Sequence, residues 1–547
     1  MNSRKPLIWA CLLCSLQAAA QTPVKGELQL GAGIGAASPY ATQLKLQFST
    51  PRFTVKPFFE LTGINRASSG TTEHLEYVYS SSGNTYHSVK EMYNKGTELR
   101  YGADAQLLLD AHNTLSAGVS NTRHSTSATG SVQEALHGNT HSKYHSLLSD
   151  PSHVLDELHA QAAFRHTTSV KGEQWSLQYS YQRKHLMEEL LQKGLEMENF
   201  DRFTNNELAT DATTQHHTVK LDWQRPVAKG QVLAAGARYE NRLITSSEEQ
   251  KLDGRVNFDE DFRHRMQVGA AYAEYRLNTA HFTVNAHVEY DYTRMQEKNL
   301  NDFVPQLMMQ WRMDAHSSLT FNYVRRIVRP ERELLSPAPI VGAYTLDYGN
   351  VDLEGVHINS FSLAYQLKGS KATYNAALAH IAAGDGFNAI WMEKDNIRIS
   401  TWGNQGIRRA WSLTQNVQWK PAEGTTFGAK AVLIWDKRVA EAIHMQKEHW
   451  GITTGLSLEQ KLFAGIAMSA EGEYTEGNTV DLYSHQGHGW ELAGGLKRNF
   501  GRCLTAGVQY TYHDHAPLIL TQGAYTGRVV THPFHKHAAM LNLTFHL

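Results

Sequence analysis

The sequence is poor in the features that mark most other classes of protein. It contains three cysteines in 547 residues, and only Cys503 lies beyond the first 20 residues. A single thiol forms no internal disulfide and supplies no zinc site. The formal net charge is −1, so the chain lacks the excess of basic residues that nucleic-acid binding requires. No apolar run of about 18 residues follows residue 20, which excludes a helical membrane protein.

The first 20 residues have the pattern of a secretion signal. Arg4 and Lys5 form a basic start, residues 7–16 are an apolar stretch, and the alanines at 18–20 suit a cleavage site. The apolar stretch is too short to span a bilayer as an anchor helix. A lipoprotein is disfavoured because Leu13 precedes Cys14, where a small residue is required. We therefore expect a signal peptide at 1–20 and a mature domain at 21–547.

Apolar and polar residues alternate through almost the whole mature chain. In the stretch HFTVNAHVEYDYT, every second residue from Phe282 to Tyr292 is apolar, and the residues between them are polar or charged. The stretches HTVKLDWQ (217–224) and WSLTQNVQW (411–419) follow the same rule. Successive side chains of a strand point to opposite faces, so each stretch predicts a strand with one apolar face. Lengths of about 10 to 14 residues suit tilted strands that cross a bilayer.

The connections between these predicted strands alternate in length. Short turns are expected near 51–52, 111–113, 171–173, 228–230, 278–280, 314–316, 369–371, 421–424 and 501–502. Longer polar loops are expected at roughly 65–95, 125–155, 186–213, 245–262, 328–356, 384–405 and 515–532. Bacterial outer-membrane barrels place short turns in the periplasm and long loops outside the cell. Charged residues on the polar parity, such as Lys220, Asp222, Glu289 and Asp291, should then line a water-filled interior rather than act as general acids and bases.

Aromatic residues are sorted along the predicted strands. Four tryptophans on the apolar parity lie close to short turns, as expected for an interfacial girdle: Trp175, Trp223, Trp311 and Trp419. Tyrosines lie near the opposite strand ends: Tyr179, Tyr181, Tyr239, Tyr290, Tyr292, Tyr323, Tyr510 and Tyr512. The chain ends in the amphipathic stretch AAMLNLTFHL, which is similar to the assembly signal of outer-membrane barrels. Counting segments predicts an all-β, antiparallel transmembrane barrel of about 22 strands.

One stretch of the predicted barrel carries a more specific pattern. The segment from Tyr323 to Tyr365 reads YVRRIVRPERELLSPAPIVGAYTLDYGNVDLEGVHINSFSLAY. It resembles the TonB-dependent receptors of Bacteroidetes, in the outer membrane protein β-barrel family. The matching residues are Arg326, Ile327, Arg329 and Pro330 at the corner, Leu335 and Pro337 after it, Gly349, Asn350 and Leu353 at the turn, and Ser360, Leu363 and Tyr365 on the following strand. Val351 and the pair Gly355-Val356 depart from the family pattern.

The resemblance implies passage of a nutrient or other ligand across the outer membrane. In that family a plug domain precedes the first strand, but only residues 21–26 separate the predicted signal from the first predicted strand here. A domain needs on the order of 100 residues, so we expect a barrel without its own plug. Gating would then come from inward-folded loops or from a plug-like or lipoprotein partner. The alternative is a plugless barrel that serves as a structural or assembly subunit of an outer-membrane complex. Outer-membrane lipid is the other expected partner.

Candidate sites other than the six family-motif residues Arg326, Arg329, Pro330, Pro337, Gly349 and Asn350 are weak. Histidines cluster late in the chain, at positions 485, 488, 513, 515, 532, 535 and 537. Parity turns His513 and His515 towards the lumen but His535 and His537 away from it, which disfavours a metal or haem site because metal ligands must converge. Residues 183–200 carry leucines at helical spacing and predict a loop helix, as a lid or a docking element.

An enzymatic activity is not expected. Outer-membrane hydrolases bring serine, histidine and a carboxylate or amide together on the barrel wall. With 29 histidines, chance pairs with serine are expected here. The Gly-x-Ser-x-Gly nucleophile motif is not present. We therefore predict no catalytic residues and no cofactor.

Overall fold

The computed structural model describes residues 24–34, 38–64, 70–79, 82–138, 142–198, 203–440, 444–478, 484–514, 518–522, 525–532 and 536–546. The signal peptide expected at 1–20 lies outside these residues. Within them, no helix is long and apolar enough to cross a membrane.

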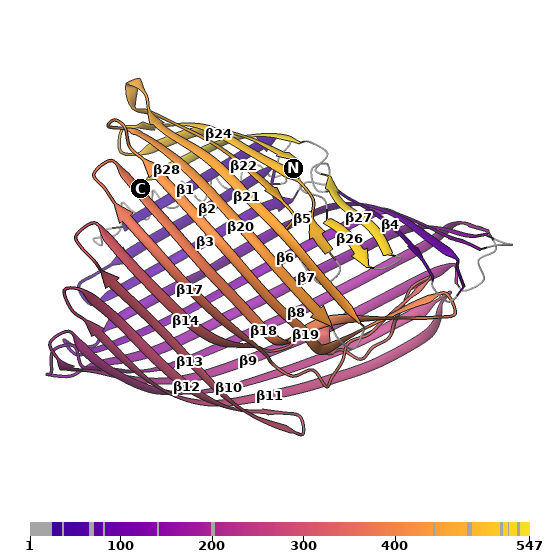
Figure 1. Ribbon diagram of the computed structural model, residues 1–547, viewed down its shortest axis with the longest axis horizontal. Helices are drawn as coiled ribbons and strands as arrows, with labels where there is room; N and C mark the ends of the chain where they lie inside the picture. Colours follow the sequence, from indigo (N-terminus) through magenta and orange to yellow (C-terminus); the bar gives the residue numbers. More distant parts are fainter. Residues whose placement is uncertain are drawn as a thin grey trace.

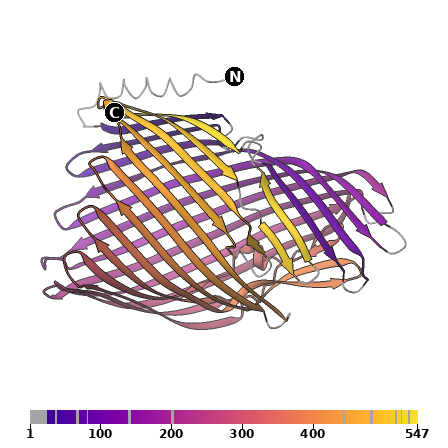
Figure 2. The ribbon, with the colours of Figure 1, turned by 45° about the horizontal axis from the view of Figure 1, so that its top comes forward.

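Twenty-two of the described strands form one closed antiparallel ring, as predicted (Figures 1 and 2). The first half of the ring consists of β1 (Val24–Ile34), β2 (Tyr40–Ser49), β3 (Phe53–Ile64), β5 (Thr85–Leu108), β6 (Asn113–His137), β7 (Ser142–Thr167), β8 (Gln174–Glu198), β9 (Asn205–Ala228), β10 (Gln231–Leu252), β11 (Arg255–Asn278) and β12 (Phe282–Met295). The second half consists of β13 (Lys298–Arg312), β14 (Ser317–Val328), β17 (Val356–Lys368), β18 (Ala372–Lys394), β19 (Ile397–Trp419), β20 (Thr425–Ala440), β21 (Met445–Lys461), β22 (Ile466–Glu476), β24 (Gly489–Phe500), β25 (Leu504–Asp514) and β28 (His537–His546).

The last strand closes the ring against the first. β28 pairs antiparallel with β1 from Glu27 and His546 to Ile34 and Ala539, and its other edge pairs with β25. The amphipathic end of the sequence is therefore a barrel strand, as its alternation predicts. Closure leaves no free sheet edge in the membrane, where an unpaired backbone group would be costly.

The two ends of the barrel differ. Every short turn predicted from the sequence joins neighbouring strands at one end, the short-turn end. A further turn at 462–465, which contains the 3-10 helix η3 (Phe463–Gly465), lies at the same end and was missed. Both β1 and β28 have their chain-terminal ends here, since Glu27 pairs with His546.

The opposite end, which we call the long-hairpin end, contains strands rather than most of the predicted loops. β6 and β7 are 25 and 26 residues long, well beyond the lengths expected from the sequence. The prediction of loops at 125–155 and 186–213 is wrong, because the hairpins continue as paired strands past the membrane. Shorter strands here belong to connections: β4 (Gly70–Val78), β23 (Ser484–Gln486), β26 (Leu518–Gln522) and β27 (Tyr525–His532), which pair with one another and with β5.

The predicted helix at 183–200 is also wrong. Residues up to Glu198 belong to β8 and pair with β7 on one side and, up to Lys193, with β9 on the other. Residues 199 and 200 lie outside the described part. Leu195 is the extra residue of a bulge, since Gly194 and Glu196 pair with the consecutive residues Leu147 and Ser146. Pairing to two neighbours outweighs the weak helical preference of an isolated leucine pattern.

The outer face of the wall carries an apolar band between two aromatic belts. The predicted tryptophan girdle is confirmed at the short-turn end, where Trp175 pairs with Trp223 and Trp311 stacks on Phe282. A second row was not predicted: Trp411, Trp435 and Trp450 pair across β19, β20 and β21 near the long-hairpin end, at the level of the expected tyrosines.

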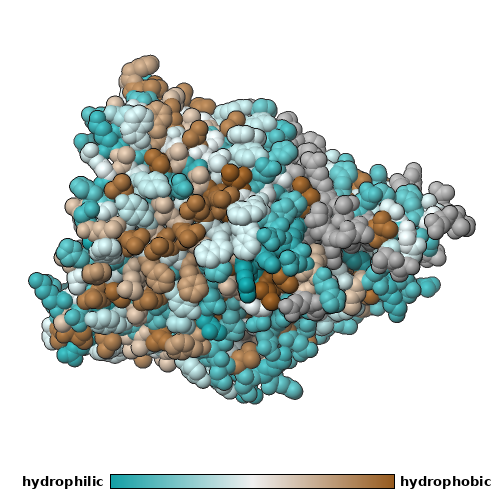
Figure 3. Space-filling model, in the orientation of Figure 1, coloured by the Kyte–Doolittle hydropathy of each residue, from teal (hydrophilic) through white to brown (hydrophobic). Residues whose placement is uncertain are grey.

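Eight residues along β19 separate Trp411 from Trp419, or about 26 Å of strand and roughly 20 Å of membrane depth at 40° tilt. Brown apolar residues gather over the β17 to β21 part of the wall in Figure 3, and teal residues dominate towards the long hairpins. The band and its two belts therefore match the outward face of a membrane barrel.

Candidate functional site

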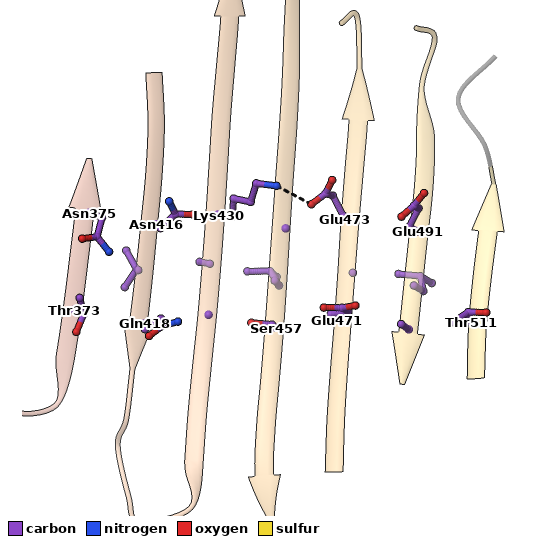
Figure 4. Close-up of a pocket in the computed structure, with 18 of the residues that line it drawn as sticks. Thr373, Asn375, Asn416, Gln418, Lys430, Ser457, Glu471, Glu473, Glu491 and Thr511 are labelled. Atoms are coloured by element: carbon purple, nitrogen blue, oxygen red, sulfur yellow. Dashed lines mark hydrogen bonds and ion pairs between the residues drawn. The ribbon is translucent and has the colours of Figure 1, made fainter. Parts of the chain in front are cut away.

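One side of the lumen is lined by uncharged polar side chains. A hollow of about 790 Å³ runs along the inner faces of β17 to β25 (Figure 4). Its lining includes amides and hydroxyls from successive strands: Gln366, Thr373, Asn375, Asn416, Gln418, Ser457, Gln509 and Thr511. Carboxylates gather at one edge. Glu473 on β22 lies beside Glu491 on β24, Glu471 lies two residues from Glu473 on the same strand, and Lys430 bonds Glu473 at 3.0 Å. The hollow offers hydrogen bonds to a polar solute over several strands.

The other side of the lumen is charged and internally paired. Arg238 on β10 contacts Glu240 on its own strand, and also Glu289 at 2.7 Å and Asp291 at 3.5 Å on β12. Lys220 pairs with Asp222 at 3.1 Å, and both side chains line a smaller hollow. The four charged residues expected inside the barrel are therefore confirmed in that position.

The connection between β14 and β17, residues 329–355, folds into the barrel. We call it the inward segment; it contains α2 (Arg332–Leu335) and the short strands β15 (Ile340–Val341) and β16 (Thr345–Asp347). Its strand partners Arg242, Glu248 and Asp291 all belong to the lumen-facing rows of β10 and β12. Since their side chains point inward, the segment lies inside the mouth at the long-hairpin end.

Four of the six family-motif residues hold this segment in place. Arg329 donates to Asp291 at 3.1 Å and to Thr293 at 3.0 Å. The buried Pro330 accepts a bond from Arg242 at 2.5 Å through its carbonyl oxygen. Gly349 donates its backbone N–H to the carbonyl of Ser336 at 2.6 Å.

Asn350 is the fourth of these residues and links the inward segment to β19. Its side-chain amide donates to the carbonyl of Trp402 on β19 at 2.9 Å, while its backbone N–H bonds the carbonyl of Leu334 at 2.7 Å. The remaining two family-motif residues do not take part in these contacts. Arg326 is exposed on β14, and Pro337 is exposed on the segment itself.

β10 supplies the main seat for the inward segment. Gln250 bonds both the carbonyl and the N–H of Val341, at 2.8 and 3.2 Å, in the manner of a neighbouring strand. The buried Glu248 accepts bonds from Arg332 at 3.1 Å and Ser336 at 2.8 Å. Below these polar contacts, Ile244 and Phe262 pack against Leu335 and Leu353 in an apolar cluster.

The tip of the inward segment reaches from one wall of the barrel to the other. The ring of Tyr344 packs edge-on against Tyr86 of β5, with ring centres 5.2 Å apart. The carbonyl of the same residue accepts a bond from the N–H of Arg398 on β19 at 2.9 Å. β5 and β19 lie ten strands apart by the shorter route around the 22-strand ring. The segment therefore spans the mouth.

The tips of two long hairpins also meet over the mouth. Ser82 and Asn84, in the turn before β5, bond the side chain of Asn396 at 2.5 and 3.2 Å. Asn396 lies in the turn between β18 and β19. These contacts join opposite walls independently of the inward segment.

The late histidines follow the predicted parity where they are described. His513 faces the lumen beside Glu491, whereas His537 faces outward against Tyr510 and Tyr512. His485 stacks on His449 with ring centres 4.0 Å apart. His515, His535 and the side chain of His532 lie outside the described part. In that part, no three histidine, cysteine or acidic side chains are arranged to hold a metal ion.

Sequence reasoning missed His264, which lies on β11 five residues beyond the aromatic level of Gly269. It is 1% exposed, and neither ring nitrogen has a hydrogen-bond partner among the described residues. Burial and the nearby Arg242 lower its pKa from 6.5 to about 4. The imidazole is therefore neutral at physiological pH.

We expect His264 to make the barrel sensitive to acid. The unfolded chain binds a proton near pH 6.5 but the folded one only near 4, so this contribution to stability is complete above about 6.5 and falls as the pH drops to 4. The full loss is on the order of 3 kcal/mol. A His264→Leu variant should lose less stability than wild type between pH 7 and 4.5, measured by unfolding midpoints. Equal losses in the two proteins would contradict this assignment.

The fold and the lumen define a class, the large outer-membrane β-barrels that include TonB-dependent receptors. The model of the outer membrane protein beta-barrel family matches residues 166–510, and the chain belongs to that family. Its location is the outer membrane.

Solved structures agree on the fold. The FrpB iron transporter of Neisseria meningitidis is 9% identical with a TM-score of 0.65, over 96% of this chain and 83% of that one. A mutant ferric enterobactin receptor of Pseudomonas aeruginosa is 10% identical with a TM-score of 0.62, over 96% and 81%. FpvA of P. aeruginosa bound to heterologous pyoverdines is 9% identical with a TM-score of 0.60, over 96% and 72%. No curated protein sequence matches the chain.

Proposed function

We propose that this barrel conducts a polar solute across the outer membrane and that the inward segment is its gate on the long-hairpin side. The observation that carries the proposal is Tyr344, which contacts β5 through its ring and β19 through its carbonyl. A segment bound to opposite walls restricts the passage between them. Structural neighbours described as a receptor and a transporter support passage rather than catalysis.

The size of the barrel requires a gate. Strands about 4.8 Å apart and tilted by about 40° give a 22-strand wall a backbone diameter of roughly 40 Å. An opening of that width would admit large antibiotics. We propose that the inward segment closes the exterior side and that a plug-like or lipoprotein partner completes the closure.

The lumen chemistry favours an uncharged, hydrogen-bonding solute. The hollow on β17 to β25 presents amides and hydroxyls at regular spacing, which can exchange bonds with a moving solute without holding it tightly. The charged opposite wall pairs its own groups, as between Arg238 and Glu289. On the hollow's side, the carboxylates of Glu471, Glu473 and Glu491 add negative charge at one edge, beside the uncharged amides and hydroxyls.

Purification from the native membrane tests this function. Mass spectrometry of the purified complex should identify a partner, and planar-bilayer conductance should rise when the partner is stripped away. A stripped barrel that stays closed to every solute, with a stoichiometric partner, would instead indicate a structural or assembly subunit. A partner-free barrel with large open conductance, from cells that exclude vancomycin-sized drugs, would contradict the gate.

The orientation follows the pattern of bacterial barrels, with the long-hairpin end outside the cell. We expect a cysteine at Ser247, exposed on β10, to react with an impermeant maleimide on intact cells. A cysteine at Lys229, in the turn between β9 and β10, should react only after lysis. Both variants need a Cys503→Ser background, because that thiol is exposed. The reverse labelling pattern would invert the topology.

A further inference from the structure

Three arginines on the outer face of the barrel lie just beyond the aromatic belt of the long-hairpin end. Arg263 and Arg265 belong to β11 and Arg294 to β12, and all three side chains are exposed on the membrane-facing parity. We call them the arginine cluster. Arg294 follows Tyr292 by two residues, and Arg265 lies four residues from Gly269, the register partner of both Tyr239 and Tyr292. At about 3.3 Å per residue and 40° tilt, the cluster extends from roughly 5 Å beyond the belt at Arg294 to roughly 15 Å at Arg263.

The cluster has no acidic partner among the described residues. No described ion pair includes Arg263, Arg265 or Arg294, and the one hydrogen bond involving their guanidinium groups runs from Arg265 to the amide of Asn241 at 2.9 Å. Gln267 pairs in register with Arg294 and is followed on the same face by Arg265, so the two arginines are diagonal neighbours about 7–8 Å apart. Like charges at that spacing repel one another. An anion between them would remove the repulsion.

The surroundings limit which anion fits. Below the cluster, the outward side chains Val288, Tyr290 and Tyr292 form the apolar and aromatic surface that contacts acyl chains. Beyond it, Asp259 and Asp261 on β11 and Glu249 on β10 repel anions on the far side. Positive charge is therefore confined to one level, that of the lipid headgroups.

We propose that the arginine cluster binds a phosphate group of lipid A in the outer leaflet. Arginine presents a planar fork of donors that matches phosphate oxygens in pairs. Asn241 and Gln267 supply amides at the same level for the sugar, and the hydroxyl of Tyr239 accepts a bond from Gln267 at 2.9 Å, which fixes that amide. The acyl chains lie against the apolar band below. This proposal rests on the orientation given above but not on transport through the lumen.

Binding of defined lipids to the purified barrel tests the proposal. Native mass spectrometry in detergent compares bisphosphorylated lipid A with the same lipid after removal of both phosphates. We expect the phosphorylated form to bind at least about tenfold more tightly. The variant Arg263→Gln/Arg265→Gln/Arg294→Gln should lose most of this preference. The matched control is Arg498→Gln, since Arg498 is also exposed on the outer face but lies over Phe500 at the short-turn end.

The outcomes separate the possible sources of the effect. Equal binding of both lipids, or an unchanged preference in the triple variant, would overturn the proposal. Displacement of lipid A by inorganic phosphate at equal concentration would also overturn it, because the site would then recognise the free ion. If the triple variant fails to fold, the single variant Arg294→Gln and the charge-preserving Arg294→Lys provide the comparison. We expect Arg294→Lys to retain more of the preference than Arg294→Gln, and equal loss would count against a role for charge. Because the assay uses no solute transport, its result is independent of the gate.

Discussion

Replacing Gly349 with valine should open the mouth of the barrel. A Cβ atom at this position would lie 2.4 Å from the carbonyl oxygen of Ser336 and 2.7 Å from the carbonyl carbon of Leu335. Both are backbone atoms that cannot move aside alone, so the 349–350 turn must separate from α2. The hydrogen bond from Gly349 to Ser336 is then lost, and Asn350 is displaced from the carbonyl of Trp402 with it. We expect the inward segment to leave its seat on β10 and the single-channel conductance to rise severalfold.

The measurement is planar-bilayer conductance of the purified barrel, combined with limited trypsin digestion. Cleavage at Arg332, which is mostly buried against Glu248 in wild type, reports displacement of the segment directly. The matched control is Val351→Ala, two residues away in the same segment but on an exposed side chain. If trypsin cleaves the Gly349→Val variant at Arg332 while the conductance of that variant stays at the wild-type value, the inward segment is not the gate.

The number of barrel strands could be predicted because each membrane crossing requires alternation with one apolar face. The length of the strands could not. Beyond the aromatic belts both faces of a strand contact water, so the residues no longer alternate between apolar and polar. The backbone pairing between strands nevertheless continues. β7 and β8 show this: from Ser142 to Thr167 and from Gln174 to Glu198 they stay paired through sequence that has the composition of loops. The same reasoning explains why a leucine pattern in β8 was mistaken for a helix.

The candidate site could be predicted only in part, for a related reason. Family resemblance selected Arg329, Pro330, Gly349 and Asn350, and in the structure all four hold the inward segment in place. The β10 residues that hold the inward segment, Arg242, Glu248 and Gln250, come from a strand about 90 residues earlier in the chain, and in the sequence they look like ordinary lumen-facing positions. One signal was available. Lumen parity on β10 beyond Tyr239 includes the apolar Ile244 beside the large polar residues Arg242, Glu248 and Gln250, which indicates that something inside the barrel contacts them.

Removing the carboxylate of Asp436 should destabilise the barrel more than removing any exposed lumen carboxylate. Asp436 on β20 is 2% exposed and receives bonds from two arginines. Arg408 donates to one oxygen at 2.9 and 2.6 Å, and Arg438 donates to the other at 3.2 Å. In Asp436→Ala the two guanidinium groups lose their shared acceptor and repel each other across neighbouring strands. Breaking a buried ion pair from one side costs about 3–5 kcal/mol. Because the Arg408 side chain is 40% exposed and can recover water, we expect the lower end of that range.

Glu473→Ala is the matched control for Asp436→Ala. Glu473 also faces the lumen and pairs with Lys430 at 3.0 Å, but the two side chains are 42% and 45% exposed. A pair that water already screens contributes about 0–1 kcal/mol, so its loss should barely change the unfolding midpoint. Midpoints are measured by the shift in gel mobility on heating and by tryptophan fluorescence, with Asp436→Asn as a third variant. The asparagine keeps the shape and an acceptor oxygen but not the charge, so its midpoint should fall between those of wild type and Asp436→Ala. The two carboxylates differ chiefly in burial. Equal midpoints for Asp436→Ala and Glu473→Ala would therefore show that burial does not strengthen the Asp436 contacts.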